Sequence, residues 1–336
     1  MAVSSSICSS HRQTRTRTTI RGPTMTPSPS GTARRITNGS VELAVFEEGN
    51  PDGETIVLVH GWPDTHDLWS RVVPFLTERF RVVSYDSRGA GRSTVPTRVE
   101  DYRLPALAGD LFAVIEAVSP GRPVHVLAHD WGSVEAWEAV CEPGARARIA
   151  SFTSVSGPNL DHLGKWMRRR LSDRSFGGPL AQAVASGYTV LFQIPGLATL
   201  PLRLWFSRHW PAFLKFFDRL DPALVRPAPT LADDMVNGLK LYRANIRTSL
   251  LRPRERYTDV PVQLILNKND KAVRPVGYED TEKWAPDLRR REVDAGHWSP
   301  ISHAEDIAQL AAEFVLAVED RQWTDLSDGP SESASA

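Results

Sequence analysis

Asp130 occupies a position where a strand-like run changes into a helix-like one. The apolar run from Val124 stops at Ala128, and a helical pattern begins just beyond Gly132. A sharp strand-to-helix turn lifts its central side chain above a sheet and needs small residues two places before and after it, as here. A carboxylate raised in this way can attack carbon by displacement and form an alkyl ester. The same Asp could instead serve only as a helix N-cap.

Two further residues would complete such a site. Asp270 directly follows the strand-like run Val262–Asn267, and His297 lies in a loop before the last helical run. An acid just past the end of a strand is well placed to orient a histidine, and the chain order of nucleophile, acid and histidine is that of the α/β hydrolases. We therefore predict that His297, oriented by Asp270, activates water.

A loop after the strand-like run Thr55–Val59 has the sequence His-Gly-Trp-Pro-Asp and begins at His60. Such a loop can turn a backbone N–H toward the nucleophile. We expect the N–H groups of Trp62 and Trp131 to form an oxyanion hole. His60 is expected to brace the loop rather than to act in catalysis.

The elements that must position these residues alternate along the chain. Apolar strand-like runs and helical runs follow each other, which predicts an α/β fold, the α/β-hydrolase fold, with a mostly parallel sheet covered by helices on both faces. The alternation breaks over residues 158–255, where mainly helical patterns predict an inserted cap. The core is expected at 37–157 and 256–320. The predicted strands are 41–46, 55–59, 81–85, 124–128, 149–155, 262–267 and 290–293.

The two ends of the chain differ in composition from the rest. Residues 1–36 are rich in Ser, Thr, Arg and Pro, and residues 321–336 are polar and acidic, so both are predicted to be disordered. The first segment also has the composition of a transit peptide, or could precede a true start at Met25. Only two cysteines and no apolar run of spanning length indicate a cytoplasmic protein. With a net charge of +0, nothing in the composition points to nucleic acid as a partner.

An aromatic and leucine-rich segment, residues 195–217, lies in the middle of the predicted cap. It either packs the cap onto the core or forms an apolar entrance for a lipophilic substrate, with contact to a membrane surface.

Four motifs carry a resemblance to a known family. His60–Pro63, Ala128–Ser133, Asn267–Asp270 and Gly296–Trp298 resemble the motifs of the α/β-hydrolase-fold epoxide hydrolases. The similarity covers about residues 41 to 318 and looks closest to the hydrolase domain of EphD-type proteins, in which a short-chain dehydrogenase domain follows. The present sequence stops without that second domain. The resemblance therefore implies no nicotinamide cofactor, and no metal.

The resemblance also implies two cap tyrosines that donate protons to the epoxide oxygen. Tyr242 matches one of them. The other normally precedes a Phe-Gln pair, but Leu191 stands there, and the nearest tyrosine is Tyr188. Because it lies three residues away on an expected helix, Tyr188 either faces the pocket or serves only in packing.

These residues predict an epoxide hydrolase that converts a small, lipophilic epoxide into a vicinal diol. A haloalkane dehalogenase is the first alternative, because His129–Ser133 resembles that family as well and Trp131 could bind a halide. A non-catalytic ligand receptor on the same fold is the second. The intact Asp130, Asp270 and His297 argue against a receptor.

Overall fold

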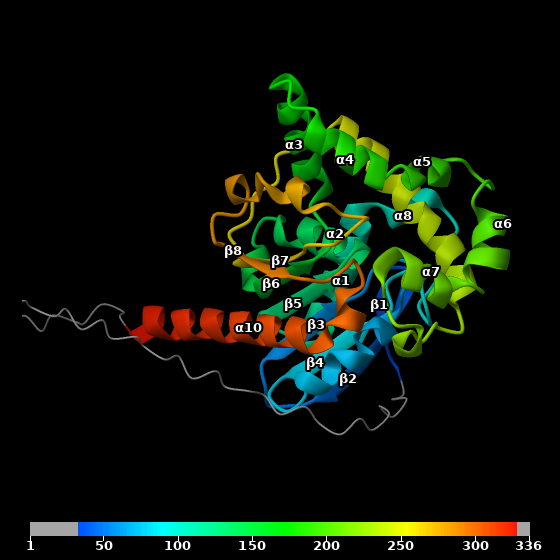
Figure 1. Ribbon diagram of the computed structural model, residues 1–336. Helices are drawn as coiled ribbons and strands as arrows, with labels where there is room; N and C mark the ends of the chain where they lie inside the picture. The colour runs from blue at the N-terminus through cyan, green and yellow to red at the C-terminus, as the bar shows by residue number, and fades with distance from the viewer. Residues whose placement is uncertain (1–32, 328–336) are drawn as a thin grey trace, which may run out of the picture.

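An eight-stranded sheet forms the centre of the molecule, described here by a computed structural model of residues 33–327 (Figure 1). The strands follow the spatial order β1-β2-β4-β3-β5-β6-β7-β8. The strands β1 and β2 run antiparallel to each other, β2 pairs antiparallel with β4, and the remaining pairs are parallel. Their bounds are Arg34–Asn38, Val41–Gly49, Thr55–Val59, Arg81–Tyr85, Val124–His129, Ile149–Val155, Val262–Asn267 and Leu288–Val293.

Helices cover both faces of this sheet, and each face has its own hydrophobic core. Along β3, Ile56 and Leu58 belong to a cluster that includes the first half of α10, whereas Val57 and Val59 belong to a second cluster with α1 and α2. This alternation follows from the period of two in a strand. The predicted α/β-hydrolase architecture is confirmed. The helices concerned are α1 (Leu104–Val118), α2 (Trp131–Val140), the short α9 (Ser299–Ser302) and α10 (Ala304–Ser327).

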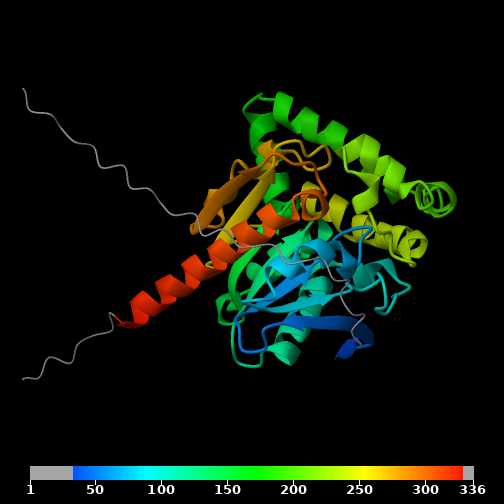
Figure 2. The same cartoon turned by 60° about the horizontal axis from the view of Figure 1, so that its bottom comes forward.

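A second group of helices follows β6 and precedes β7, and we call residues 160–251 the cap. It lies over the edge of the sheet where Asp130, Asp270 and His297 are found (Figures 1 and 2). Its helices are α3 (Leu160–Ser172), α4 (Gly177–Ala185), α5 (Tyr188–Gln193), α6 (Thr199–Pro201), α7 (Trp210–Asp218) and α8 (Leu231–Leu251), with a π-helical turn, η5 (Leu202–Phe206), after α6. Short 3-10 turns lie at His66–Arg71, Val73–Phe75, Val99–Tyr102, Ala145–Ala147, Pro222–Leu224, Pro275–Tyr278 and Thr281–Lys283.

The ordered chain extends further at both ends than the composition predicts. The strand β1 begins at Arg34, inside the segment expected to be disordered, because it pairs along its length with β2 and buries Ile36. Because β1 begins with two arginines, its sequence does not show the apolar alternation by which a strand is predicted. Helix α10 continues to Ser327, past the expected boundary at residue 320. The rest of both predicted tails lies outside the described residues. Within 33–327, no helix is long and apolar enough to cross a membrane.

Candidate active site

Asp130 sits at the turn between β5 and α2 with an unusual backbone conformation. Its φ is 50°, a value that non-glycine residues rarely adopt. The turn is tight, since a Cβ on Gly132 would lie 2.4 Å from the carbonyl oxygens of Val59 and His60. The Asp130 side chain makes no hydrogen bond that caps α2. The N-cap interpretation is therefore wrong, and the carboxylate is directed elsewhere.

The two oxygens of the Asp130 carboxylate have different partners. Oδ2 accepts a hydrogen bond of 2.9 Å from the backbone N–H of Trp62. Oδ1 lies 3.6 Å from Nε2 of His297. One oxygen is thus held by the loop after β3, and the other faces the histidine.

His297 is held between two carboxylates. Its Nδ1 lies 2.9 Å from Oδ2 of the buried Asp270. The other Asp270 oxygen accepts the N–H groups of Ala272 and Val273, each at 2.8 Å. Burial opposes charge on Asp270, but the neighbouring His297 and these hydrogen bonds outweigh it, so that the pKa of Asp270 is lowered. Burial likewise disfavours the imidazolium, yet Asp270 and Asp130 raise the pKa of His297 well above its usual value.

The loop after β3 and the first turn of α2 supply the backbone donors. His60 braces the loop, because its Nδ1 lies 2.9 Å from the carbonyl oxygen of Gly61 and its Nε2 accepts the Ser87 N–H at 3.0 Å. Trp131 is the first residue of α2, and its backbone N–H therefore has no acceptor within that helix. A Cβ on Gly61 would lie 2.7 Å from this nitrogen and 2.6 Å from Oδ2 of Asp130, so only glycine lets the loop approach so closely.

The structure also brings Tyr188 and Tyr242 together. Their ring centroids are 6.2 Å apart. Burial raises the pKa of the Tyr242 phenol well above its usual value, so Tyr242 stays protonated at neutral pH. The side chain of Tyr188 is 38% exposed, and that of Leu191 is 53% exposed. Tyr188 is thus the tyrosine of α5 that lies beside Tyr242.

The two indoles near Asp130 differ in their contacts. Nε1 of Trp62 donates to the carbonyl oxygen of Met235 at 3.1 Å. The ring of Trp131 lies edge-on to that of Tyr242, with centroids 4.8 Å apart. The Trp62 indole N–H is thus already engaged.

Two acidic residues near the triad were missed by the sequence-based reasoning. Asp218, at the end of α7 in the cap, accepts the backbone N–H groups of His297 at 2.6 Å and Trp298 at 2.7 Å. Asp64 accepts the Trp298 indole N–H at 2.9 Å, and burial raises its pKa to about 7. Asp64 could have been found, since it ends the His-Gly-Trp-Pro-Asp loop. No sequence signal marks Asp218.

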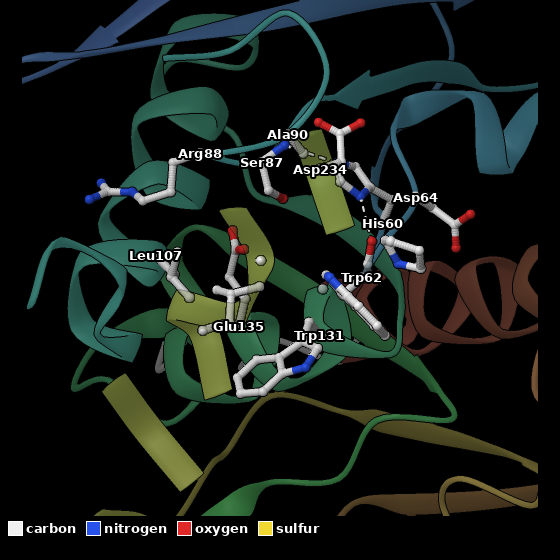
Figure 3. A pocket seen from close by; sticks show the side chains of 16 residues that line it. His60, Trp62, Asp64, Ser87, Arg88, Ala90, Leu107, Trp131, Glu135 and Asp234 are labelled. Carbon is white, nitrogen blue, oxygen red and sulfur yellow. Dashed lines mark hydrogen bonds between the residues drawn. The ribbon is translucent and has the colours of Figure 1, made fainter. Parts of the chain in front are cut away.

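A small cavity lies beside the loop that contains Trp62 (Figure 3). Trp131 and Asp64 line it together with two buried acids, Glu135 and Asp234. Burial is the main cause that raises the pKa of Glu135 to about 8 and that of Asp234 to about 7. These acids therefore hold protons near neutral pH. The cavity places exchangeable protons next to the loop but adds little negative charge to the site.

Among the described residues, one group of side chains could present three ligand atoms to a metal ion. It consists of Glu54, His125 and Glu319, of which His125 lies near the start of β5, five residues before Asp130. Arg122 already donates to Glu54 at 3.2 Å, and Glu319 lies 3.1 Å from Nε2 of His125.

Comparison with known proteins agrees with this geometry. A family model described as the alpha/beta hydrolase fold matches residues 54–188. The chain is 45% identical over 297 residues to the "Probable oxidoreductase EphD" of Mycobacterium tuberculosis, which covers 86% of this chain and 48% of that protein. It is 24% identical to the "Bifunctional epoxide hydrolase 2" of Sus scrofa, covering 82% of this chain and 53% of that one. The chain spans about half the length of these curated relatives.

Solved structures show the same fold. An epoxide hydrolase from Bacillus megaterium superposes with a TM-score of 0.68 at 20% identity, covering 84% of this chain and 99% of that one. An epoxide hydrolase from Vigna radiata gives a TM-score of 0.66 at 20% identity, covering 85% and 97%. The chain therefore has the α/β-hydrolase fold. In sequence it is similar to EphD and to epoxide hydrolases.

Proposed function

We propose that this protein hydrolyses epoxides through an ester on Asp130. The observation that carries the proposal is that Asp130 faces His297 while Tyr242, packed against Trp62 and Trp131 and next to Tyr188, stands beside it. Attack of Oδ1 on an epoxide carbon breaks the ring C–O bond, and the released oxygen takes a proton from a phenol. The contacts support Oδ1 as the attacking atom, since the Trp62 N–H already holds Oδ2.

The second half-reaction hydrolyses the ester. Esterification removes the negative charge of Asp130, which is one of the two charges that keep His297 protonated. The pKa of His297 then falls, so that it can accept a proton from water through Nε2 while Asp270 holds Nδ1. Water adds to the carboxyl carbon of Asp130, and the negative charge develops on Oδ2. The N–H groups of Trp62 and Trp131 stabilise that charge. Collapse of the intermediate expels the diol, whose leaving oxygen takes the proton held by His297. The proton of the added hydroxyl returns to the phenolate, so that the Asp130 carboxylate and the phenol are regenerated.

The engaged Trp62 indole and the paired tyrosines favour an epoxide over an alkyl halide. A dehalogenase must offer two free N–H donors to the leaving halide, but the Trp62 indole already donates to Met235. An epoxide oxygen instead needs proton donors, which the two tyrosines supply. We propose further that the sheet and the helices covering it form the catalytic core, that residues 160–251 form its cap, and that the substrate is lipophilic, because aromatic rings surround the tyrosines.

A single turnover in heavy-oxygen water tests the mechanism. With enzyme in excess over an aryl epoxide, we expect unlabelled diol in the first turnover and label in Asp130, detected by peptide mass spectrometry. Label in the first diol would refute the ester intermediate.

A turnover panel of epoxides and primary alkyl halides tests the substrate class. We expect diol from epoxides, little halide release, and no turnover of either class by an Asp130→Asn variant. Halide release without diol formation would reverse the assignment. Binding of both classes without turnover would favour a receptor.

A further inference from the structure

The outer side of the cap exposes many large apolar side chains. Val184 is 74% exposed and Phe216 is 86% exposed. We call this group the cap rim: Leu180, Val184, Val190, Leu191, Ile194, Leu197, Leu200, Leu204, Trp205 and Phe216, each more than one third exposed. Isolated exposed apolar residues are ordinary on proteins, but a concentration of them marks an interaction surface.

The spacing of these residues shows a second apolar face on helices that already bury one. Around α6 and η5, Ala198 and Leu202 are buried toward the rest of the cap, while Leu197, Leu200 and Leu204 are exposed. Leu180 and Val184 on α4 are four residues apart and share a helix face. The helices α4, α5 and α6 follow one another along the outer edge of the cap, on the side away from the sheet (Figures 1 and 2). A helix that is apolar all round is normally buried, so this face lacks a cover.

The charged residues within the segment that carries the cap rim have one sign. From Arg174 to Phe217 the sequence contains no Asp or Glu, although the whole chain has 40 acidic residues and a net charge of +0. Arg203, Arg208 and Lys215 are exposed within this stretch. Arg203 pairs with Asp233 of α8, but within residues 33–327 no salt bridge neutralises Arg208 or Lys215.

We propose that the cap rim binds the surface of an anionic lipid bilayer. Its leucines and Trp205 would enter the headgroup region, and Arg208 and Lys215 would contact lipid phosphates. A second copy of this chain is a poorer occupant of the same face, because two cap rims in contact would bring the exposed Arg208 and Lys215 of both copies together, and the segment that carries them contains no Asp or Glu. The described residues contain no spanning helix, so the chain would lie on the bilayer without crossing it.

Binding to vesicles tests the proposal. Full-length protein is sedimented with vesicles of phosphatidylcholine alone or of equal parts phosphatidylcholine and phosphatidylglycerol, at low and high salt. We expect binding to the anionic vesicles only, weakened by salt because the attraction between charges is screened.

Paired variants distinguish vesicle binding by the cap rim from vesicle binding by other parts of the chain. None of them alters the arginine-rich N-terminal segment. Leu200→Glu/Leu204→Glu should weaken binding about a hundredfold, and Arg208→Glu/Lys215→Glu at least about twentyfold. The matched controls are Val95→Glu/Tyr257→Glu and Arg98→Glu/Arg122→Glu. These four residues are exposed outside the cap, so the controls should bind as the parent protein does. Circular dichroism and thermal melting verify that each variant is folded.

Several results would overturn the proposal. One is anionic-vesicle binding that is equal in cap-rim variants and controls. Another is a lack of vesicle binding combined with a dimer, detected by light scattering, that the Leu200→Glu/Leu204→Glu variant loses. Because binding does not depend on the reaction, Asp130→Asn should bind vesicles as the parent does. Failure of this proposal would therefore leave the proposed activity untouched.

Discussion

Asp218 joins the cap to the loop that carries His297, and its removal should slow one half of the reaction more than the other. Its carboxylate accepts two backbone hydrogen bonds, at 2.6 Å from His297 and 2.7 Å from Trp298. Gly296 permits this approach, since a Cβ there would lie 2.0 Å from Oδ1 of Asp218. Asp218 touches neither the reacting carboxylate nor the water and acts as a positioning residue.

The magnitude follows from those two contacts. Hydrogen bonds to a charged group contribute about 1.5–3 kcal/mol each. Asp218 is only partly buried, so water would replace part of the loss, and Asp218→Ala should cost about 2–4 kcal/mol of unfolding free energy. A shift of the His297 ring by about 1 Å would lower the rate of ester hydrolysis about a hundredfold. Formation of the ester on Asp130 does not use His297 and should be nearly unchanged.

The assay is a rapid-quench time course with enzyme in excess over epoxide, in which intact-protein mass spectrometry follows the ester. In Asp218→Ala, the ester should accumulate and decay slowly. Asp218→Asn retains an acceptor oxygen, so its rate of ester hydrolysis should lie between those of the parent protein and Asp218→Ala. A mere loss of stability would not produce this order. The reasoning is wrong if both half-reactions slow equally, or if the folded Ala variant hydrolyses the ester at the parent rate.

Two other properties follow from the tyrosines and the buried acids. Tyr242→Phe should lower the rate of ester formation by about 10²–10⁴-fold. Tyr188→Phe should also lower this rate if both phenols donate. A Tyr188→Phe variant that forms the Asp130 ester at the parent rate would assign Tyr188 to packing. Leu191→Phe, an exposed change on the same helix, is the control. Burial raises the pKa of Asp234 from 3.8 to about 7. Between these two pH values the folded chain keeps the Asp234 proton, whereas the unfolded chain has released it. The free energy of unfolding therefore falls as pH rises through this window. Urea unfolding at pH 5 and pH 8 should show this loss, and Asp234→Asn should reduce it; an equal loss in the variant would contradict the assignment.

Most strands of the central sheet could be predicted from local sequence patterns alone. The runs that became β3, β4, β6 and β7 were predicted with the bounds that the structure shows. A strand buried on both faces reads as a continuous apolar run, and α1 buries the stripe from Leu104 to Val118 that its spacing indicates. Because parallel strands place their carboxyl ends on one edge, Asp130, Asp270 and His297 could be expected to meet there.

Contacts made by side chains from distant elements were beyond the reach of the sequence. Tyr188 on α5 meets Tyr242 on α8 only because the cap helices pack in one particular orientation. Asp218 contacts His297 although the two lie 79 positions apart in the chain. Nothing in the sequence around either residue indicates this contact. The sequence determined which residues could attack, orient and activate, because residue type and strand ends are local properties. The tertiary structure decided that Asp130 faces His297 rather than capping α2, that the Trp62 indole is engaged, and that the cap rim faces solvent, because these depend on how separate elements pack.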